Sequence, residues 1–188
     1  MAKQQTPRRR KPVAVSRVIS GGQTGVDRAA LDAAIAAEID IGGWCPRGRR
    51  AEDGRVPVEY PLLETAARSY AVRTEWNVRD ADGTLVVVLD DISSGTRLTI
   101  DVARKLEKPL LVIHLLPPTQ RTLLSETISG CDHIPSVVDW VRRNRIRVLN
   151  VAGPRASSDA NVYPQALEFL QQLFAELSRT YAASKKHG

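Results

Sequence analysis

One stretch of the chain, from Val18 to Leu31, most constrains the possible fold. It reads Val-Ile-Ser-Gly-Gly-Gln-Thr-Gly-Val-Asp-Arg-Ala-Ala-Leu, which predicts a short strand, a glycine-rich turn and a helix beginning near Asp27. The first N–H groups of a helix lack partners within it, and the helix dipole favours negative charge there. The turn therefore predicts a phosphate or oxyanion site over Gly21–Gly25, where glycines let the backbone approach a ligand. On this interpretation Gly22→Val abolishes binding and leaves the melting temperature nearly unchanged.

The rest of the chain alternates between apolar runs typical of strands and amphipathic runs typical of helices. Thr84–Leu89 is β-branched and apolar throughout, which indicates a strand buried on both faces. The other expected strands are Val15–Ser20, Ile39–Cys45, Leu110–Leu115 and Arg147–Val151. The expected helices are Asp27–Glu38, Thr96–Glu107, Ile134–Asn144 and Ala160–Tyr181. This alternation predicts an α/β, Rossmann-like, doubly wound fold, with a mainly parallel sheet and helices on both faces.

The segment between the second and third expected strands is less regular. Residues 46–59 are rich in Arg, Gly and Pro, which predicts a loop. Beyond it we expect a helical turn over Pro61–Arg68, a short extended piece over Tyr70–Thr74 and another helical turn over Trp76–Asp82.

The net charge of +6 is concentrated at the two ends of the chain. Residues 1–14 have no periodic apolar positions and carry five basic residues, so we expect a disordered basic tail, followed by one ligand-binding domain over 15–181 and a second tail over 182–188. Without the seven basic residues of the tails, 20 basic residues stand against 21 acidic ones. The domain itself is therefore nearly neutral, and tails of this kind serve solubility more often than recognition.

Cysteines and hydropathy limit the class of protein further. Cys45 and Cys131 have neither the spacing of metal ligands nor that of a disulfide framework, so we expect no structural metal and a reducing, cytoplasmic compartment. No apolar run approaches the ~20 residues that cross a bilayer, and the basic N-terminus lacks the apolar segment of a secretory signal. We therefore expect no membrane partner.

Four loops rich in glycine, hydroxyl groups or arginine follow expected strands. They are Gly21–Gly25, Pro46–Arg50, Asp90–Thr96 and Gly153–Arg155. Because the carboxyl ends of parallel strands meet at one edge of a sheet, these loops converge there and predict an anion pocket. Any one loop alone is explained by tight turns or by ordinary helix capping.

The candidate binding residues are the glycine loop, the hydroxyl-rich loop and nearby polar side chains. Arginines suit bidentate contacts to an anion, and Asn77 or Asp82 could address a polar ring or a sugar. For Asp82, pinning a loop is an equally good interpretation. The full set is Gly21, Gly22, Gln23, Thr24, Gly25, Arg47, Arg73, Thr74, Asn77, Asp82, Ser94, Gly95, Thr96 and Arg155.

Four strings in order resemble the "putative molybdenum carrier" family, part of a Rossmann-like superfamily that includes the lonely-guy phosphoribohydrolases and DNA-processing protein A. They are Ile19–Ala33, Gly43–Gly54, Arg73–Thr84 and Leu149–Arg155, within a match over roughly residues 17–177. The resemblance implies a homo-oligomeric carrier, a dimer or tetramer, of molybdenum cofactor or a related nucleotide-like ligand. The same resemblance implies a molybdoenzyme or a cofactor-insertion protein as its partner.

The sequence departs from the phosphoribohydrolase branch at one position. That branch carries a glycine-glycine-x-glycine-threonine-x-x-glutamate motif, and Thr99 stands where its glutamate would be, in Ser93-Ser-Gly-Thr-Arg-Leu-Thr99. A hydroxyl cannot replace a carboxylate as a base or as a charge that stabilises a cation. The sequence also departs from the pattern of the carrier family, because Ser94 stands where a second glycine is expected. The sequence therefore favours binding of a phosphorylated pterin-type ligand without turnover.

Two alternatives remain open. One is a nucleotide or nucleoside-phosphate hydrolase that uses another carboxylate, such as Asp27 or Glu75. The other is a nucleic-acid-binding module assisted by the basic tails, against which the near-neutral domain and only two Phe residues count.

Overall fold

A five-stranded parallel sheet forms the centre of the protein in the computed structural model, which describes residues 15–89, 92–115 and 133–184. The strand order is β2-β1-β9-β7-β8. The bounds are β1 Arg17–Ile19, β2 Asp40–Gly42, β7 Gly83–Val88, β8 Leu110–His114 and β9 Val148–Ala152. Each neighbouring pair is parallel. The expected α/β Rossmann-like fold is confirmed.

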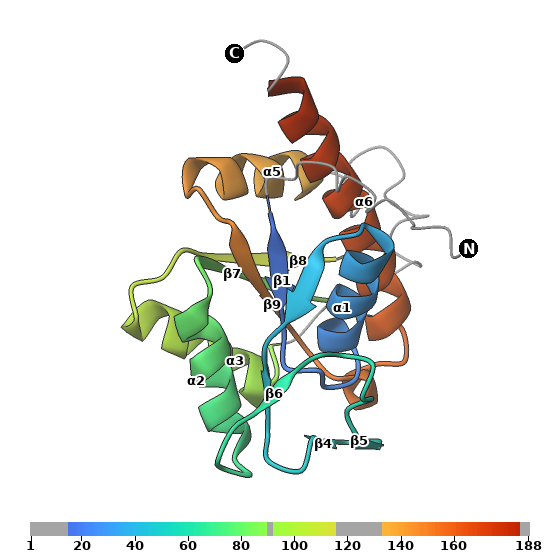
Figure 1. The fold of residues 1–188 in the computed structure, drawn as a ribbon, viewed down its shortest axis with the longest axis vertical. Helices are drawn as coiled ribbons and strands as arrows, with labels where there is room; N and C mark the ends of the chain where they lie inside the picture. Colours follow the sequence, from blue (N-terminus) through green and yellow to red (C-terminus); the bar gives the residue numbers. More distant parts are fainter. Residues whose placement is uncertain (1–14, 90–91, 116–132, 185–188) are drawn as a thin grey trace, which may run out of the picture.

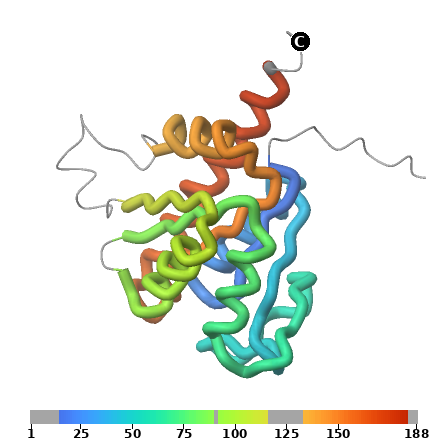
Figure 2. The backbone as a smooth tube through the Cα atoms, turned by 90° about the vertical axis from the view of Figure 1, so that its left-hand side faces the viewer, coloured from blue at the N-terminus to red at the C-terminus, as the bar shows by residue number. Residues whose placement is uncertain are grey.

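Helices cover both faces of this sheet (Figures 1 and 2). The helices are α1 Val26–Ala36, α2 Tyr70–Asp80, α3 Ser94–Lys105, α5 His133–Arg143 and α6 Val162–Ser184. Leu85 and Val87 of β7 belong to the core shared with α1, α5 and α6, whereas Val86 and Val88 pack with Ile100 of α3. β7 is buried on both faces because its alternate side chains serve these two cores, which explains its continuous apolar sequence.

The carboxyl ends of the strands place three loops on one edge of the sheet. β1, β9 and β7 run in register, with Ile19 opposite Asn150 and Asn150 opposite Thr84. The loop after β1 leads into α1, the loop after β7 leads towards α3, and the loop after β9 leads into the short 3-10 helix η2, Ala156–Ser158. The predicted edge is therefore present. Asp90 and Asp91 of the second loop lie outside the described residues.

The expected strand Ile39–Cys45 is divided in two. Gly43 has φ 125°, and beyond it β3, Trp44–Cys45, leaves the main sheet and pairs in parallel with β6, Leu63–Glu64. The helical turn expected over Pro61–Arg68 is wrong because part of this stretch pairs with β3. Leu63 N–H donates to the carbonyl of Gly43, so pairing with a distant segment extends this stretch.

The extended piece expected over Tyr70–Thr74 is also wrong. These residues form the first turns of α2, which Ser69 caps by accepting a hydrogen bond from Ala71 N–H. The helical turn expected over Trp76–Asp82 is the second half of the same helix only as far as Asp80, where α2 ends. Residues 46–59, expected as a loop, contain a two-stranded antiparallel hairpin formed by β4, Arg50–Ala51, and β5, Gly54–Arg55.

Smaller differences occur at the periphery. β8 is only partly buried because it lies at one end of the strand order. Ile35 of α1 is 51% exposed. α6 extends to Ser184, beyond the expected domain end at residue 181. The expected tail 1–14 and residues 185–188 lie outside the described residues.

Candidate functional site

The glycine loop makes close contacts with the protein's own chain. Gly25 has φ 78°, and a Cβ there would lie 2.5 Å from the carbonyl oxygen of Pro154. Gly22 has φ 71°, and a Cβ there would lie 2.6 Å from Cδ1 of Leu62. Packing therefore requires glycine at both positions whether or not a ligand binds. The expectation that Gly22→Val leaves stability unchanged does not hold in this environment.

The backbone donors of this loop are only partly free. Gln23 N–H donates to Oδ2 of Asp27 (3.2 Å) and Thr24 N–H donates to Oε1 of Gln23 (3.1 Å), so side chains of the loop itself occupy these two donors. No described residue accepts a hydrogen bond from N–H of Gly22 or Gly25. Gly25 is the N-cap of α1, and no described side chain caps this helix. Val26 N–H donates to the carbonyl of Pro154 and Arg28 N–H to that of Gln23, both at 3.2 Å, so the positive end of the helix is only partly unsatisfied.

Arg73 lies against this helix start from α2. Its Nη1 donates to Oδ2 of Asp27 at 2.8 Å, and Asp27 is only 3% exposed. A Cβ on Gly21 would overlap the guanidinium of Arg73, so Gly21 provides the space for it. Nε of Arg73 is buried and has no hydrogen-bond partner among the described residues. A buried donor without a partner is rare in folded proteins.

A carboxylate from the β4–β5 hairpin binds the hydroxyl of Thr24 in the loop. Glu52 accepts hydrogen bonds from the hydroxyl of Thr24, from Ser157 N–H (3.1 Å) and from the hydroxyl of Ser157 (2.5 Å). Nε of Arg155 lies 3.7 Å from the same carboxylate. Burial raises the pKa of Glu52, but the hydrogen bonds from Ser157 and Thr24 outweigh it and bring the pKa below its usual range.

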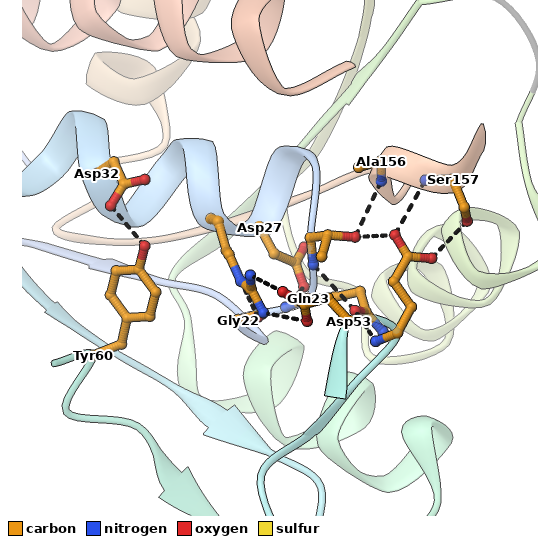
Figure 3. A network of polar contacts seen from close by, with 11 residues as sticks. Gly22, Gln23, Asp27, Asp32, Asp53, Tyr60, Ala156 and Ser157 are labelled. Atoms are coloured by element: carbon orange, nitrogen blue, oxygen red, sulfur yellow. Dashed lines mark hydrogen bonds and ion pairs between the residues drawn. The ribbon is translucent and has the colours of Figure 1, made fainter. Parts of the chain in front are cut away.

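The next residue of the hairpin is held as well. Both terminal nitrogens of Arg28 bind Asp53, at 2.5 and 2.8 Å, while Nε of Arg28 donates to the carbonyl of Gly22 at 3.2 Å (Figure 3). This bidentate pair lowers the pKa of Asp53. Glu52, Asp53 and Ser157 were not among the candidate residues. Glu52 and Asp53 do lie within the family-like string Gly43–Gly54, which was the available signal.

Two tyrosine hydroxyls share one carboxylate of α1. Asp32 of α1 accepts hydrogen bonds of 2.7 Å from the hydroxyls of Tyr60 and Tyr163. Burial, followed by the contact with Asp32, raises the pKa of Tyr163 to about 12. These two hydrogen bonds join α1 to the segment beyond the hairpin and to the first turn of α6.

The second loop behaves as a helix cap. Oγ of Ser93 accepts a hydrogen bond from Thr96 N–H at 3.3 Å, which caps α3. Ser94 and Gly95 are exposed, and no described atom lies within 4 Å of a Cβ placed on Gly95. The hydroxyl of Thr99 donates to the carbonyl of Gly95 within the helix. The described part of this loop therefore matches the capping interpretation.

Several candidate residues point elsewhere. Asn77 exchanges two hydrogen bonds with the backbone of Trp44 (2.8 and 2.9 Å), which fixes α2 to β3, and Thr74 is buried in the same helix. Asp82 accepts from the N–H groups of Arg147 and Val148 where β7 and β9 begin, at the opposite edge of the sheet. The structure brings together Gly21–Gly25, Arg73 and Arg155, and it leaves Asp82 apart from them.

The arginine cluster after the second strand divides into exposed and buried members. Arg47 is exposed. Arg49, 8% exposed, donates to four backbone carbonyls and so fixes the base of the hairpin. Those carbonyls belong to Val56, Pro57, Tyr60 and Leu62.

Other features bear on metals, membranes and cavities. Among the described residues, no three His, Cys, Asp or Glu side chains are grouped so as to hold a metal ion, and no helix is long and apolar enough to span a bilayer. Burial raises the pKa of the Cys45 thiol. Two hollows of about 750 and 780 Å³ lie between α5 and α6 and between the end of α1 and α6, both away from the glycine loop.

A parallel sheet covered on both faces, with a glycine loop and an uncapped helix at its carboxyl edge, defines a Rossmann-like α/β protein. Residues 18–174 match the model of the circularly permutated YpsA SLOG family, and the chain belongs to this family. The resemblance identified from the sequence is thereby confirmed.

A solved structure supports the same assignment. It is that of a protein from Syntrophus aciditrophicus SB described as a "putative molybdenum carrier protein", with 42% sequence identity to this chain. The match covers 86% of this chain and 96% of that one, with a TM-score of 0.77. No curated protein matches this chain.

Proposed function

We propose that this protein binds and carries a phosphorylated small molecule at the carboxyl edge of its sheet. A pterin-type ligand, molybdenum cofactor, is the leading candidate, and a nucleotide is the alternative. The description of the 42%-identical relative as a "putative molybdenum carrier protein" supports a carrier role at the level of the family. The glycine loop at the start of a helix supports a ligand with an anionic group.

Arg73 is the observation that carries the proposal. Its Nε–H is buried and has no partner among the described residues, beside a helix start that no described side chain caps. A buried donor left unpaired costs about 1–3 kcal/mol. In this proposal one oxygen of the ligand's phosphate or molybdate accepts from Nε of Arg73, and other oxygens of the same ligand accept from the free N–H groups of Gly22 and Gly25.

The remaining candidate residues take supporting roles. Gly21 leaves room for Arg73, and Thr24 and Arg155 supply a hydroxyl and a charge on the opposite side of the loop. Ser94, Gly95 and Thr96 are secondary candidates, because the described part of their loop caps α3. Arg47, Thr74, Asn77 and Asp82 have no demonstrated contact with the glycine loop and are secondary.

Calorimetric titration of the purified chain with molybdenum cofactor, molybdate, AMP and ATP tests the proposal. We expect dissociation constants in the micromolar range for at least one ligand and a loss of at least tenfold in Arg73→Lys. That variant keeps a positive charge near Asp27 but lacks the planar donor fork. Arg79→Gln is the matched control, because Arg79 lies on the same helix and pairs with Asp80 at the surface. Binding no tighter than millimolar for every ligand would contradict the proposal.

Asp27 favours one second candidate, hydrolysis of a nucleoside phosphate. It is a nearly fully buried carboxylate at the glycine loop, held by Gln23 N–H and Arg73, and it is better placed for general base chemistry there than the exposed Glu75. Incubation with nucleoside monophosphates, followed by chromatography for the free base, tests this candidate. Release of base by the wild type and its loss in Asp27→Asn would establish the enzyme, and no release would exclude it.

The assembly and surroundings of the carrier follow the family resemblance. We propose a homo-oligomer, a dimer or tetramer, in the cytoplasm, which passes its ligand to a molybdoenzyme or a cofactor-insertion protein. Light scattering on the purified chain tests the first part, and a monomer at micromolar concentration would contradict it.

A further inference from the structure

The β4–β5 hairpin is attached to the domain in two different ways. Its base is fixed, because the guanidinium of Arg49 binds backbone carbonyls beyond β5 and Val56 N–H donates to the carbonyl of Arg49 at 2.7 Å. Its two strands form a small sheet of their own, apart from the central sheet. Its tip carries little packing, and no described atom lies within 4 Å of a Cβ placed on Gly54. Polar contacts of Glu52 and Asp53 hold the tip over the glycine loop, while the neighbouring Ala51 packs against an apolar cluster that includes Val56 and Leu62.

Those polar contacts use donors that suit a ligand anion. Ala156 N–H donates to Oγ1 of Thr24 at 3.2 Å, so the hydroxyl proton of Thr24 is directed to the Glu52 carboxylate. Ser157 adds its N–H and its hydroxyl, and Arg155 adds its charge. The backbone N–H of Glu52 donates in turn to Oε1 of Gln23, inside the loop, at 2.8 Å. A carboxylate therefore occupies a set of donors that suit an oxyanion.

We infer that the β4–β5 hairpin is a strap whose Glu52 carboxylate occupies the donors of Thr24, Ser157 and Arg155, on the side of the loop opposite Arg73, and is displaced when anionic oxygens of the ligand bind these donors. The inference rests on the proposed function, since it concerns the same edge of the sheet. Phosphate oxygens and the carboxylate require the same donors, and two anions on one set of donors repel each other. Displacement of Glu52 frees the tip of the hairpin, while Arg49 keeps its base in place. Asp53 lies next to Glu52, so either its ion pair with Arg28 breaks or the Arg28 side chain moves together with Asp53.

Binding of inorganic phosphate and AMP to the full chain tests the strap. Glu52→Gln keeps the size of the side chain and removes its charge, so we expect at least fivefold tighter binding than in the wild type. Glu64→Gln is the matched control, because Glu64 is also an exposed carboxylate that accepts one backbone N–H, from Gly48 at 2.5 Å, and it makes no contact with Thr24, Ser157 or Arg155. We expect its affinity to equal that of the wild type.

Hydrogen exchange of the unaltered chain provides a second measurement. At saturating AMP, the backbone amides of residues 50–55 in the hairpin should exchange faster than without AMP. The amides of the glycine loop, Gly21–Gly25, should exchange more slowly. Unchanged affinity in Glu52→Gln, or unchanged exchange at the hairpin, in a chain that binds AMP would overturn the strap alone. Failure of the wild type and both variants to bind phosphate or AMP would overturn the strap together with binding of these two ligands at this edge.

Discussion

The starts of α1 and α3 lie on the same edge of the sheet and have similar sequences, yet they differ in physical character. Both follow a parallel strand and combine glycine with hydroxyl residues. α3 begins with Ser93, whose side chain caps it, and its Gly95 stands in open space. α1 begins with Gly25, which is enclosed by Pro154 and Ala156, and no described side chain caps it. Small residues before a helix thus indicate a cap in one case and a candidate anion site in the other.

The largest difference between the two helix starts should appear on adding side chains to their glycines. Gly25→Val should lower the free energy of unfolding by about 3 kcal/mol or more, because φ is positive and the new Cβ meets backbone atoms at 2.5 and 2.8 Å. Gly95→Ala should raise the same free energy by about 0.5–1 kcal/mol through helix propensity. Urea unfolding measures both. Equal effects at the two positions would show that the enclosure of Gly25 is unimportant.

The next largest effect concerns the ion pair between Asp27 of α1 and Arg73 of α2. Asp27→Ala should lower the free energy of unfolding by about 2–3 kcal/mol, because it leaves the partly exposed Arg73 without its partner 2.8 Å away. The double variant Asp27→Ala/Arg73→Ala should be more stable than the sum of the single losses predicts. A double-mutant cycle by urea unfolding checks this, and simple additivity would mean that the pair contributes no coupling.

The cap of α3 should have a smaller effect. Ser93→Ala removes the acceptor for Thr96 N–H and should cost about 1 kcal/mol, whereas Ser93→Asp should retain the stability of the wild type. Ligand affinity should change in neither variant if this loop is only a cap. A tenfold loss of AMP or molybdate binding in Ser93→Ala would instead assign the second loop to the ligand site.

The smallest effect is the pH dependence of the hairpin. The pKa values of Glu52 and Asp53 are lowered in the folded state, so their stabilisation is present above their unfolded values of about 4 and is lost as the pH falls through the folded values. The stability difference between the wild type and the double variant Glu52→Gln/Asp53→Asn should therefore shrink from pH 6 to pH 3. Thermal unfolding at several pH values measures it, and a constant difference would contradict the assignment.

Prediction from sequence succeeded where structure is local. β7 was recognised because a continuous β-branched run suits a strand buried on both faces, and α1 because glycine precedes an amphipathic stretch. It failed over residues 61–74. There β6 exists only by pairing with β3, and α2 begins earlier than expected because Ser69 caps it.

The same contrast between local patterns and long-range contacts applies to the candidate site. Gly21–Gly25 and Arg73 were identified from residue type and position, and the structure brings them together. Glu52 and Ser157 were missed because they are 105 residues apart and meet only at the folded edge. Asp82 was a candidate because of its neighbours in the sequence, but its carboxylate binds backbone N–H groups where β7 and β9 begin.

The amino-acid sequence by itself determined the parallel α/β architecture and the glycine loop before α1, because hydrophobic periodicity and the freedom of glycine act over a few residues. Only the tertiary structure decided which donors of that loop are occupied, where Arg73 lies and which carboxylate covers the edge. Those contacts depend on side chains that β1, α2, the hairpin and the segment after β9 bring within 2.5–3.7 Å of one another, and no local pattern encodes such distances.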